Sequence, residues 1–198
     1  MILSNVEIHR ALDAKHLIIE PEPKPRKLTK DEQCPYQTSS VDLTLGDEVS
    51  FIASNAKIPA NIDLREGKFA TIFGPYSKQF MLTETQPFML QPKTFVLAKT
   101  REKVTFPLRK GMNLAGRVEG KSSYARCGLL VHFTAPTIHA GYSGTITLEL
   151  INFGPIAIGL YPDMPICQLI IEQVFGNPFP NESQFQGQNR AGGVLKKP

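Results

Sequence analysis

Cysteine is scarce in this sequence, with 3 among 198 residues, at Cys34, Cys127 and Cys167. Their number is odd and they lie far apart along the chain, which argues against a disulfide framework. No two of them have the Cys-x-x-Cys spacing that is typical of structural zinc sites. The sequence therefore gives no sign of a disulfide framework or of a structural zinc site.

Long apolar runs are also missing. No segment approaches the length of a membrane span, and the N-terminus lacks the basic flank and apolar stretch of a secretory signal. We therefore expect a cytoplasmic protein without a membrane partner.

The excess of positive charge is small, with a formal net charge of +4. Such a value is compatible with an anionic small ligand, with a nucleic acid, or with neither. Because the basic residues are scattered and no aromatic residues alternate with them, we do not expect a nucleic-acid partner.

Proline and glycine, in contrast, are plentiful, with 16 and 15 residues spread along the chain. Turn-forming residues at this frequency favour many short strands over a few long helices. The 41% hydrophobic and 20% charged content is ordinary for a globular protein, and the length suits one domain spanning residues 1–198.

The hydrophobic pattern predicts a mainly β chain with a short N-terminal helix. Ser4 and Glu7 have capping-box spacing, so a helix is expected up to His16, followed by an irregular segment at 20–38. Residues 41–45 alternate as in a half-buried strand, which Gly46 and Asp47 are expected to end. Further strands are expected at 48–52, 95–100, 129–134, 145–150, 156–160 and 168–174. Such a series indicates a β-barrel or jelly roll, and residues 176–198 are expected to form a flexible tail that could act as a lid.

Residues 120–128, Gly-Lys-Ser-Ser-Tyr-Ala-Arg-Cys-Gly, are the first candidate site. Hydroxyls, cations and free backbone N–H groups at a helix start suit a phosphate group, although the same residues could be a solvated helix cap. A P-loop is rejected, because the position five before Gly120 is Ala115 and Gly116 is one residue too close.

Glu149 is the second candidate, because it lies in an otherwise uncharged run on a predicted strand, on the same face as Thr145 and Thr147. A carboxylate there must be paired, hydrogen-bonded or shifted in pKa, since unpaired burial is costly. It could act as a general base toward water, or it could be held by Arg126 purely for stability. The pattern alone leaves both interpretations open.

His132 and His139 suggest a metal site at first sight, but no Cys-x-x-Cys pair or second carboxylate completes a ligand set. The zinc deaminase signature, His-x-Glu followed by Pro-Cys-x-x-Cys, is absent as well. We expect no protein-bound metal, and any deamination would have to proceed without zinc.

Several motifs, in this order, resemble those of the dCTP deaminase and dUTPase superfamily. Residues 118–129 are similar to its Gly-Arg-Ser-Ser-Leu-Ala-Arg-x-Gly-Leu motif, 131–135 to Val-His-Val-Thr-Ala, and 141–149 to Gly-Phe-x-Gly-x-Ile-Thr-Leu-Glu. Residues 160–169 resemble Leu-Tyr-Pro-Gly-Met-x-Ile-x-Gln-Leu. Shorter likenesses are found at 1–4, 40–46 and 186–188, so the resemblance covers nearly the whole chain.

The resemblance implies a distorted β-barrel or jelly roll of the dUTPase-like type, with few helices beyond the N-terminal one, that assembles as a homotrimer with shared active sites. It implies that Glu149 activates a water that attacks the cytosine C4, while Ser122 and Arg126 hold the water and the glutamate. The reaction expected first is the hydrolytic deamination of dCTP to dUTP and ammonia.

The resemblance also assigns the substrate contacts. Backbone groups around Phe133 and Ala135 would bind the base edge, Tyr142 would pack on the deoxyribose, and the triphosphate with its Mg²⁺ would be covered by the tail. The full set of implied substrate-binding residues is Lys121, Ser122, Ser123, Arg126, Phe133, Thr134, Ala135, His139, Tyr142, Thr147, Leu148, Gln184 and Gln188.

Three positions depart from the family pattern. Lys121 replaces an arginine and loses its bidentate fork. His139 replaces an aspartate that contacts the sugar and, in dUTPases, helps to position the attacking water. Gln184 replaces a tail lysine. Two alternatives to the dCTP deaminase therefore remain: a dUTP pyrophosphatase or bifunctional enzyme, against which His139 counts, and a divergent nucleotide-binding or regulatory member without efficient catalysis.

Overall fold

The computed structural model describes residues 1–198 except 31, 54–55, 59–62, 64, 66–72, 182–184 and 193–198. The helical elements within this part are α1 (Asn5–Asp13), η2 (Gly74–Tyr76) and α3 (Ser122–Ala125). The strands are β1 (Ile18–Glu20), β2 (Val41–Ile52), β3 (Ser77–Met81), β4 (Phe88–Leu90), β5 (Phe95–Thr105), β6 (Asn113–Gly120), β7 (Leu129–Leu130), β8 (Thr137–Ile138), β9 (Ser143–Asn152), β10 (Ile158–Leu160) and β11 (Pro165–Val174).

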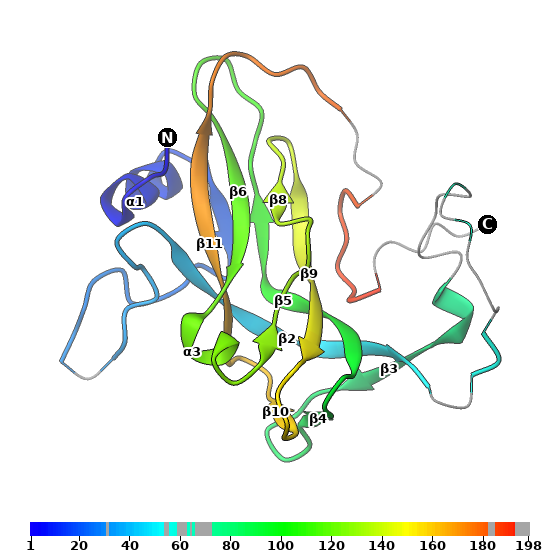
Figure 1. Ribbon diagram of the computed structural model, residues 1–198. Helices are drawn as coiled ribbons and strands as arrows, with labels where there is room; N and C mark the ends of the chain where they lie inside the picture. The colour runs from blue at the N-terminus through cyan, green and yellow to red at the C-terminus, as the bar shows by residue number, and fades with distance from the viewer. Residues whose placement is uncertain are drawn as a thin grey trace.

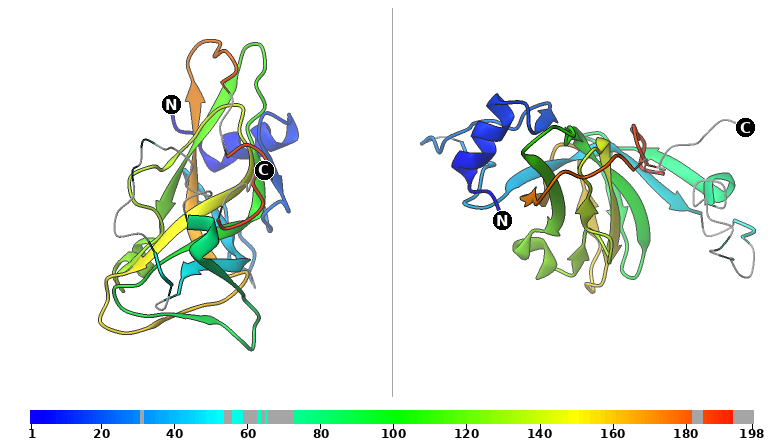
Figure 2. Two further views of the ribbon diagram at one scale, coloured as in Figure 1. Left: turned by 90° about the vertical axis from the view of Figure 1, so that its right-hand side faces the viewer. Right: turned by 90° about the horizontal axis from the view of Figure 1, so that it is seen from above.

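Nine of these strands form one antiparallel sheet that curls into a partial barrel (Figures 1 and 2). Its path runs β7-β9-β5-β2-β11-β6-β8, with β1 added to β5 and β3 added to β2, while β10 and β4 form a separate pair. α1 lies outside the sheet, to one side. The mainly β architecture with a short N-terminal helix and few other helical turns is therefore confirmed.

The core lies inside the curl and is supplied by alternating strand positions. Along β9, Ile146, Leu148 and Leu150 are buried, whereas Thr147 and Glu149 on the other face remain partly exposed. This alternation is the period-2 pattern seen in the sequence. It directs the polar face of β9 toward the opening of the barrel, where the candidate site lies.

β2 is one continuous strand, so the prediction that Gly46 and Asp47 end a strand at residue 45 is wrong. The pairing of β2 with β5 shifts register between Leu45 and Val49. A Cβ on Gly46 would lie 3.1 Å from the Lys99 carbonyl oxygen, so a glycine allows the strands to approach closely here. The glycine marks an irregularity within a strand, which sequence alone does not distinguish from a turn.

α1 ends at Asp13, three residues before the predicted end at His16. Lys15 has a positive φ of 57°, and the amides of Lys15 and His16 donate to the carbonyls of Leu12 and Ala11. This left-handed turn satisfies the last helical carbonyls and stops the helix. At the other end, the Glu7 amide donates to the Ser4 hydroxyl at 3.4 Å, as the capping-box spacing predicts.

The other strand predictions are confirmed in place but not in length. β5, β9 and β11 are longer than expected, whereas β10 and β7 are shorter, and β7 stops at Leu130 rather than 134. β6 was not predicted, because alanine and two glycines weaken its pattern. Gly116 is needed there, since a Cβ would lie 2.8 Å from Leu169 and 2.9 Å from Phe106.

The described part of the C-terminal tail lies along the free edge of β9 (Figure 1). The Thr145 amide donates to the Gln188 carbonyl at 2.9 Å, and the Gly187 amide donates to the Ser143 carbonyl at 2.8 Å. These bonds continue the sheet by a short stretch of backbone. Whether the tail moves as a lid remains a prediction.

Candidate functional site

A cavity of about 1010 Å³ lies between the two ends of the curled sheet. One wall is formed by β5 and β9, the second by β6, β8 and the turn after β8, and the third by the tail. The lining residues include Ala135, His139, Tyr142, Thr147, Glu149 and Gln188. All six were predicted from the sequence as site residues, and the fold brings them to one cavity.

Glu149 contributes a carboxylate to the β9 wall of this cavity. The Phe133 amide donates to its Oε2 at 3.4 Å, and no residue that the structure describes forms an ion pair with it. Arg126 in particular does not, so the interpretation of Glu149 as the partner of a structural ion pair finds no support within one chain. A carboxylate that keeps free lone pairs at a cavity wall is able to accept a proton from a bound water.

The segment after β7 shapes the approach to Glu149. The ring of Phe133 lies edge-on to that of Phe95, with centroids 5.7 Å apart, and Phe95 lines the cavity. Phe133, Thr134 and Ala135 are all exposed, so their backbone groups are accessible to a ligand. Leu148, in contrast, is fully buried in the core, which leaves only its backbone for a substrate contact.

A hydrogen-bond network joins the tail to the base of the cavity. The buried Tyr142 hydroxyl donates to the Thr145 carbonyl at 2.6 Å, and the Gln188 side-chain amide donates to the Tyr142 hydroxyl at 3.1 Å and to the Thr145 carbonyl at 2.8 Å. Burial raises the pKa of Tyr142 to about 12, despite the opposing effect of the Gln188 hydrogen bond, so the phenol stays neutral. A Cβ on Gly144 would lie 2.9 Å from this hydroxyl, which explains the glycine there.

Two buried oxygens at the cavity make no hydrogen bond with any described residue. They are Oγ1 of Thr147 and Oε1 of Gln188. Buried polar atoms nearly always have a partner in native proteins, so these two oxygens stand out among the polar groups of the site.

His139 and Tyr142 face the cavity from a tight turn. The Tyr142 amide donates to the His139 carbonyl at 3.1 Å, and Gly141 between them has φ 90°. A positive φ at the third position is the requirement of a type II turn, which glycine meets without strain. The turn presents the exposed imidazole of His139 where the family pattern has an aspartate.

Lys121 lies outside the cavity, although it was predicted to bind phosphate. Its ammonium is 2.5 Å from Asp42 Oδ2, and Gln168 donates to Asp42 Oδ1 at 3.1 Å. Both members of the ion pair are largely buried. Within one chain the lysine therefore fixes β2 and β11 to the start of α3.

Ser122, Ser123 and Arg126 also lie outside the cavity, on or next to the four-residue helix α3. All three are exposed, and Arg126 forms no ion pair with the part of the chain that the structure describes. The predicted catalytic trio of Glu149, Ser122 and Arg126 is therefore not assembled within a single chain. Gln184 lies outside the described residues.

Sequence reasoning missed the apolar wall opposite the polar face of β9. Leu97 lies across from Glu149 in the register of β5 and β9, and Ala115, Ile138 and Phe179 line the remaining walls. The register of two strands separated by some 50 residues is not readable from either strand alone, so no sequence signal marked these positions.

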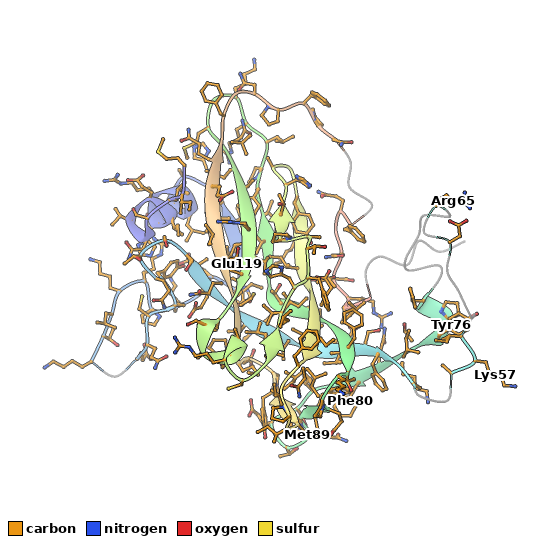
Figure 3. The ribbon with its side chains drawn as sticks, in the orientation of Figure 1. Lys57, Arg65, Tyr76, Phe80, Met89 and Glu119 are labelled. Carbon is orange, nitrogen blue, oxygen red and sulfur yellow. The ribbon has the colours of Figure 1, made fainter. Side chains whose placement is uncertain are left out.

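The histidines do not gather metal ligands among the described residues, where no group of three His, Cys, Asp or Glu side chains lies together. His132 Nε2 is 3.7 Å from Oε2 of Glu119, which projects from β6 (Figure 3). His139 is on the cavity instead. No helix in the described part of the chain is long and apolar enough to cross a membrane.

Comparisons with known proteins agree with these features. A family model described as dCTP deaminase-like matches residues 2–174. A dCTP deaminase, dUMP-forming, of Methanosphaera stadtmanae is 34% identical over 189 residues, covering 96% of this chain and 86% of the relative. A dCTP deaminase of Thermomicrobium roseum is 34% identical over 198 residues, covering 100% of this chain and 92% of the relative.

Among solved structures, the 2'-deoxycytidine 5'-triphosphate deaminase of Agrobacterium tumefaciens is similar, with a TM-score of 0.58 and 18% sequence identity. The match covers 87% of this chain and 47% of that one, so this chain spans about half the length of the Agrobacterium protein. At this identity the likeness shows a shared fold.

Proposed function

This chain belongs to the dCTP deaminase-like family, and from that membership and the geometry of the cavity we propose that it hydrolyses the C4 amino group of dCTP, giving dUTP and ammonia. The observation that carries the proposal is the Glu149 carboxylate at the cavity wall, with no cation of its own chain to neutralise it. A base in that place is what hydrolytic deamination requires.

The proposed reaction needs one proton carrier and one water. Glu149 takes a proton from the water as its oxygen bonds to C4 of the cytosine ring, and passes that proton to ring N3. It then moves the second proton of the water from the new C4 hydroxyl to the exocyclic nitrogen. The C4–N bond breaks, ammonia leaves, and the added oxygen becomes O4 of uracil. The Phe133 amide, 3.4 Å from Oε2, keeps the carboxylate oriented during this exchange.

The rest of the cavity suits a pyrimidine deoxynucleoside. Exposed backbone at 133–135 offers donors and acceptors to the base edge, and the ring of Tyr142 provides a flat apolar surface for the sugar. Thr147 and Gln188 also line the cavity and add polar side chains to its wall.

The phosphate end of the site is proposed to come from a second copy of the chain. Ser122, Ser123 and Arg126 are exposed on α3, and the cavity beside Glu149 has no phosphate-binding cation from them. If α3 of one subunit meets the cavity of the next, the exposed hydroxyls and guanidinium gain an anionic partner. This is the arrangement of a homotrimer with active sites shared between subunits.

Mg²⁺ is proposed to arrive with the triphosphate, whose charge it would partly neutralise. The phosphate oxygens, Ser122 and Ser123 offer the oxygen ligands that this ion prefers. The chemical step at C4 is assigned to Glu149 and needs no protein-bound zinc.

We propose dUTP as the product because His139 stands where the family has an aspartate. In dUTPases that carboxylate helps to position the water that attacks the phosphate chain, and an imidazole does not replace its charge. The name of the Methanosphaera relative, dUMP-forming, supports a bifunctional alternative in which pyrophosphate also leaves. The burial of Lys121 against Asp42 supports a second alternative, a nucleotide-binding protein without efficient catalysis.

A product assay separates these functions. Purified protein with Mg²⁺ is given dCTP, dCMP or dUTP, and ammonia, pyrophosphate and each nucleotide are measured. We expect equal amounts of ammonia and dUTP from dCTP, no pyrophosphate, and loss of both products in Glu149→Gln but not in Glu172→Gln, a carboxylate outside the cavity. Equal ammonia, dUMP and pyrophosphate would establish the bifunctional enzyme, and no turnover of a correctly assembled protein would refute the deaminase.

A further inference from the structure

Glu48 is a buried carboxylate that the proposed reaction does not use. It lies on β2, opposite Met81 of β3, and is 5% exposed, between the exposed Asp47 and the fully buried Val49. A carboxylate in such a place is costly unless a donor or cation satisfies it. The identity of its partners is therefore informative.

Both described partners of Glu48 come from the C-terminal tail. The Ala191 amide donates to Glu48 Oε1 at 3.3 Å, and Nε of Arg190 is 3.9 Å from Oε2. Arg190 also donates from Nη2 to Oε1 of Gln79, on β3, at 3.0 Å. We call these four residues (Glu48, Gln79, Arg190 and Ala191) the tail clamp.

The tail clamp lies next to the part of the tail that closes the cavity. Gln188 is two residues before Arg190, and its backbone and side chain bond to Thr145 and Tyr142. Ala191 is fully buried and lines the cavity itself. The stretch 188–191 is thus attached to β9 at one end and to β2 and β3 at the other.

Attachment at both ends matters because an ordered segment loses conformational entropy. If the tail were bonded at Gln188 alone, the motion of the following residues would shift the Gln188 side chain away from the cavity. The tail clamp restricts this motion because it bonds those residues to β2 and β3 of the sheet. The side chain of Gln188, which lines the cavity, is thereby held in place.

We propose that Glu48 and Arg190 are positioning residues that hold the tail, and with it Gln188, closed over the nucleotide. Their effect on turnover rests on the proposed function, whereas the closure itself does not. Glu48 makes the larger contribution, because its carboxylate is buried and accepts a backbone N–H. The guanidinium of Arg190 is half-exposed and solvent weakens its charge interaction.

The first test needs no nucleotide, because the Arg190–Ala191 peptide bond is itself a trypsin site. A docked tail protects this bond, since a protease must extract the segment before cleaving it. We expect Glu48→Gln to raise the rate of cleavage after Arg190 about five- to tenfold, as expected for weakening one charge-assisted hydrogen bond. Asp47→Asn is the matched control, because Asp47 is the neighbouring carboxylate and faces Lys99 instead.

The second test is kinetic. If the clamp positions the tail, Glu48→Gln should raise KM for dCTP about fivefold and leave kcat within about twofold, since the clamp touches no reacting atom. Arg190 is half-exposed, so Arg190→Gln will not unfold the chain. This variant should also raise KM at nearly constant kcat, by a smaller factor than Glu48→Gln. The double variant should lose less than the sum of the two single effects, because both changes break the Glu48–Arg190 contact, while the contacts with Ala191 and Gln79 are separate.

The outcomes separate the clamp from the proposed reaction. Faster cleavage after Arg190 in Glu48→Gln supports the clamp even if the wild-type protein turns over no dCTP. Cleavage at the wild-type rate overturns it. A fall in kcat at constant KM, or additive effects of the two substitutions, also overturns it by showing that Glu48 supports the fold independently of Arg190.

Discussion

The cavity beside β9 and the helix α3 carry the two halves of the predicted site, and they differ in how complete they are. The cavity brings Tyr142, Thr147 and Glu149, on and just before β9, together with Gln188 of the tail, and has a volume of about 1010 Å³. α3 presents Arg126 and two serines to solvent, with no anionic partner in the described part of the chain.

Under the proposed function, one chain builds the base and sugar end of the site and leaves the phosphate end open. The curled sheet positions the cavity residues through its own register, so they need no partner. α3 follows β6, and none of its residues lines the cavity. A second subunit is the simplest source of the missing half, as a closed symmetric assembly would provide.

The largest effect should come from the cavity half. Glu149→Gln removes the proton acceptor and keeps the shape of the side chain, so we expect kcat for dCTP deamination to fall by about 10²- to 10⁴-fold. Nucleotide binding, measured by calorimetry, should be retained. A variant that loses binding as well would indicate a structural role for the carboxylate.

The next largest effect should come from Arg126 on α3. Arg126→Ala should lower kcat/KM by at least about 10²-fold, as loss of a charged group that stabilises the reacting site does. Its thermal unfolding should be unchanged, because the side chain is exposed and unpaired within the described chain. Full activity with unchanged unfolding would exclude α3 from the site.

Lys121 should behave in the opposite way, although it is only five residues before Arg126 in the sequence. Lys121→Met leaves Asp42 with Gln168 as its described partner, so we expect the free energy of unfolding to fall by about 1–3 kcal/mol. Urea unfolding measures this loss. Comparing Lys121→Met with Arg126→Ala distinguishes a cation that stabilises the fold from one that is free to bind phosphate. An unchanged free energy of unfolding in Lys121→Met would contradict the structural role of Lys121.

The smallest effect should come from Tyr142→Phe. The substitution removes the hydroxyl that joins Thr145 to Gln188, which should cost about 1 kcal/mol of folding free energy as one buried hydrogen bond. KM for dCTP should rise modestly, because Gln188 loses one of its two acceptors. An unchanged rate of cleavage after Arg190 would show that this network and the tail clamp act separately.

The sequence predicted the contents of the cavity better than its walls. Glu149 and Thr147 were recognisable because the alternation of apolar and polar residues along one strand, with a charge in an apolar run, does not depend on how that strand pairs with its neighbours. Leu97, opposite Glu149, was not, because pairing between β5 and β9 is a property of the folded sheet. Gly46 was read as a strand end for a related reason: its close approach to Lys99 depends on the neighbouring strand.

The contacts of Lys121 and Glu48 could not be predicted from the sequence, for a different reason. Each is a charge whose partner is distant along the chain, Asp42 in one case and Arg190 in the other. Spacing within a motif carries no information on such pairs. The resemblance implied that Lys121 binds a phosphate group, whereas in the structure Lys121 forms an ion pair with Asp42.

Mixing of subunits tests the shared site most directly. Glu149→Gln and Arg126→Ala chains, each carrying a different tag, are co-expressed, and mixed assemblies are purified through both tags. Each mixed closed trimer, whichever chain it holds twice, has an intact Glu149 from one chain beside an intact Arg126 from its neighbour at one of its three sites, so about one third of the sites are complete. We predict dCTP deamination near that fraction of the wild-type rate, from two variants that are nearly inactive alone. A mixture no more active than its parents would contradict a site shared between copies of the chain.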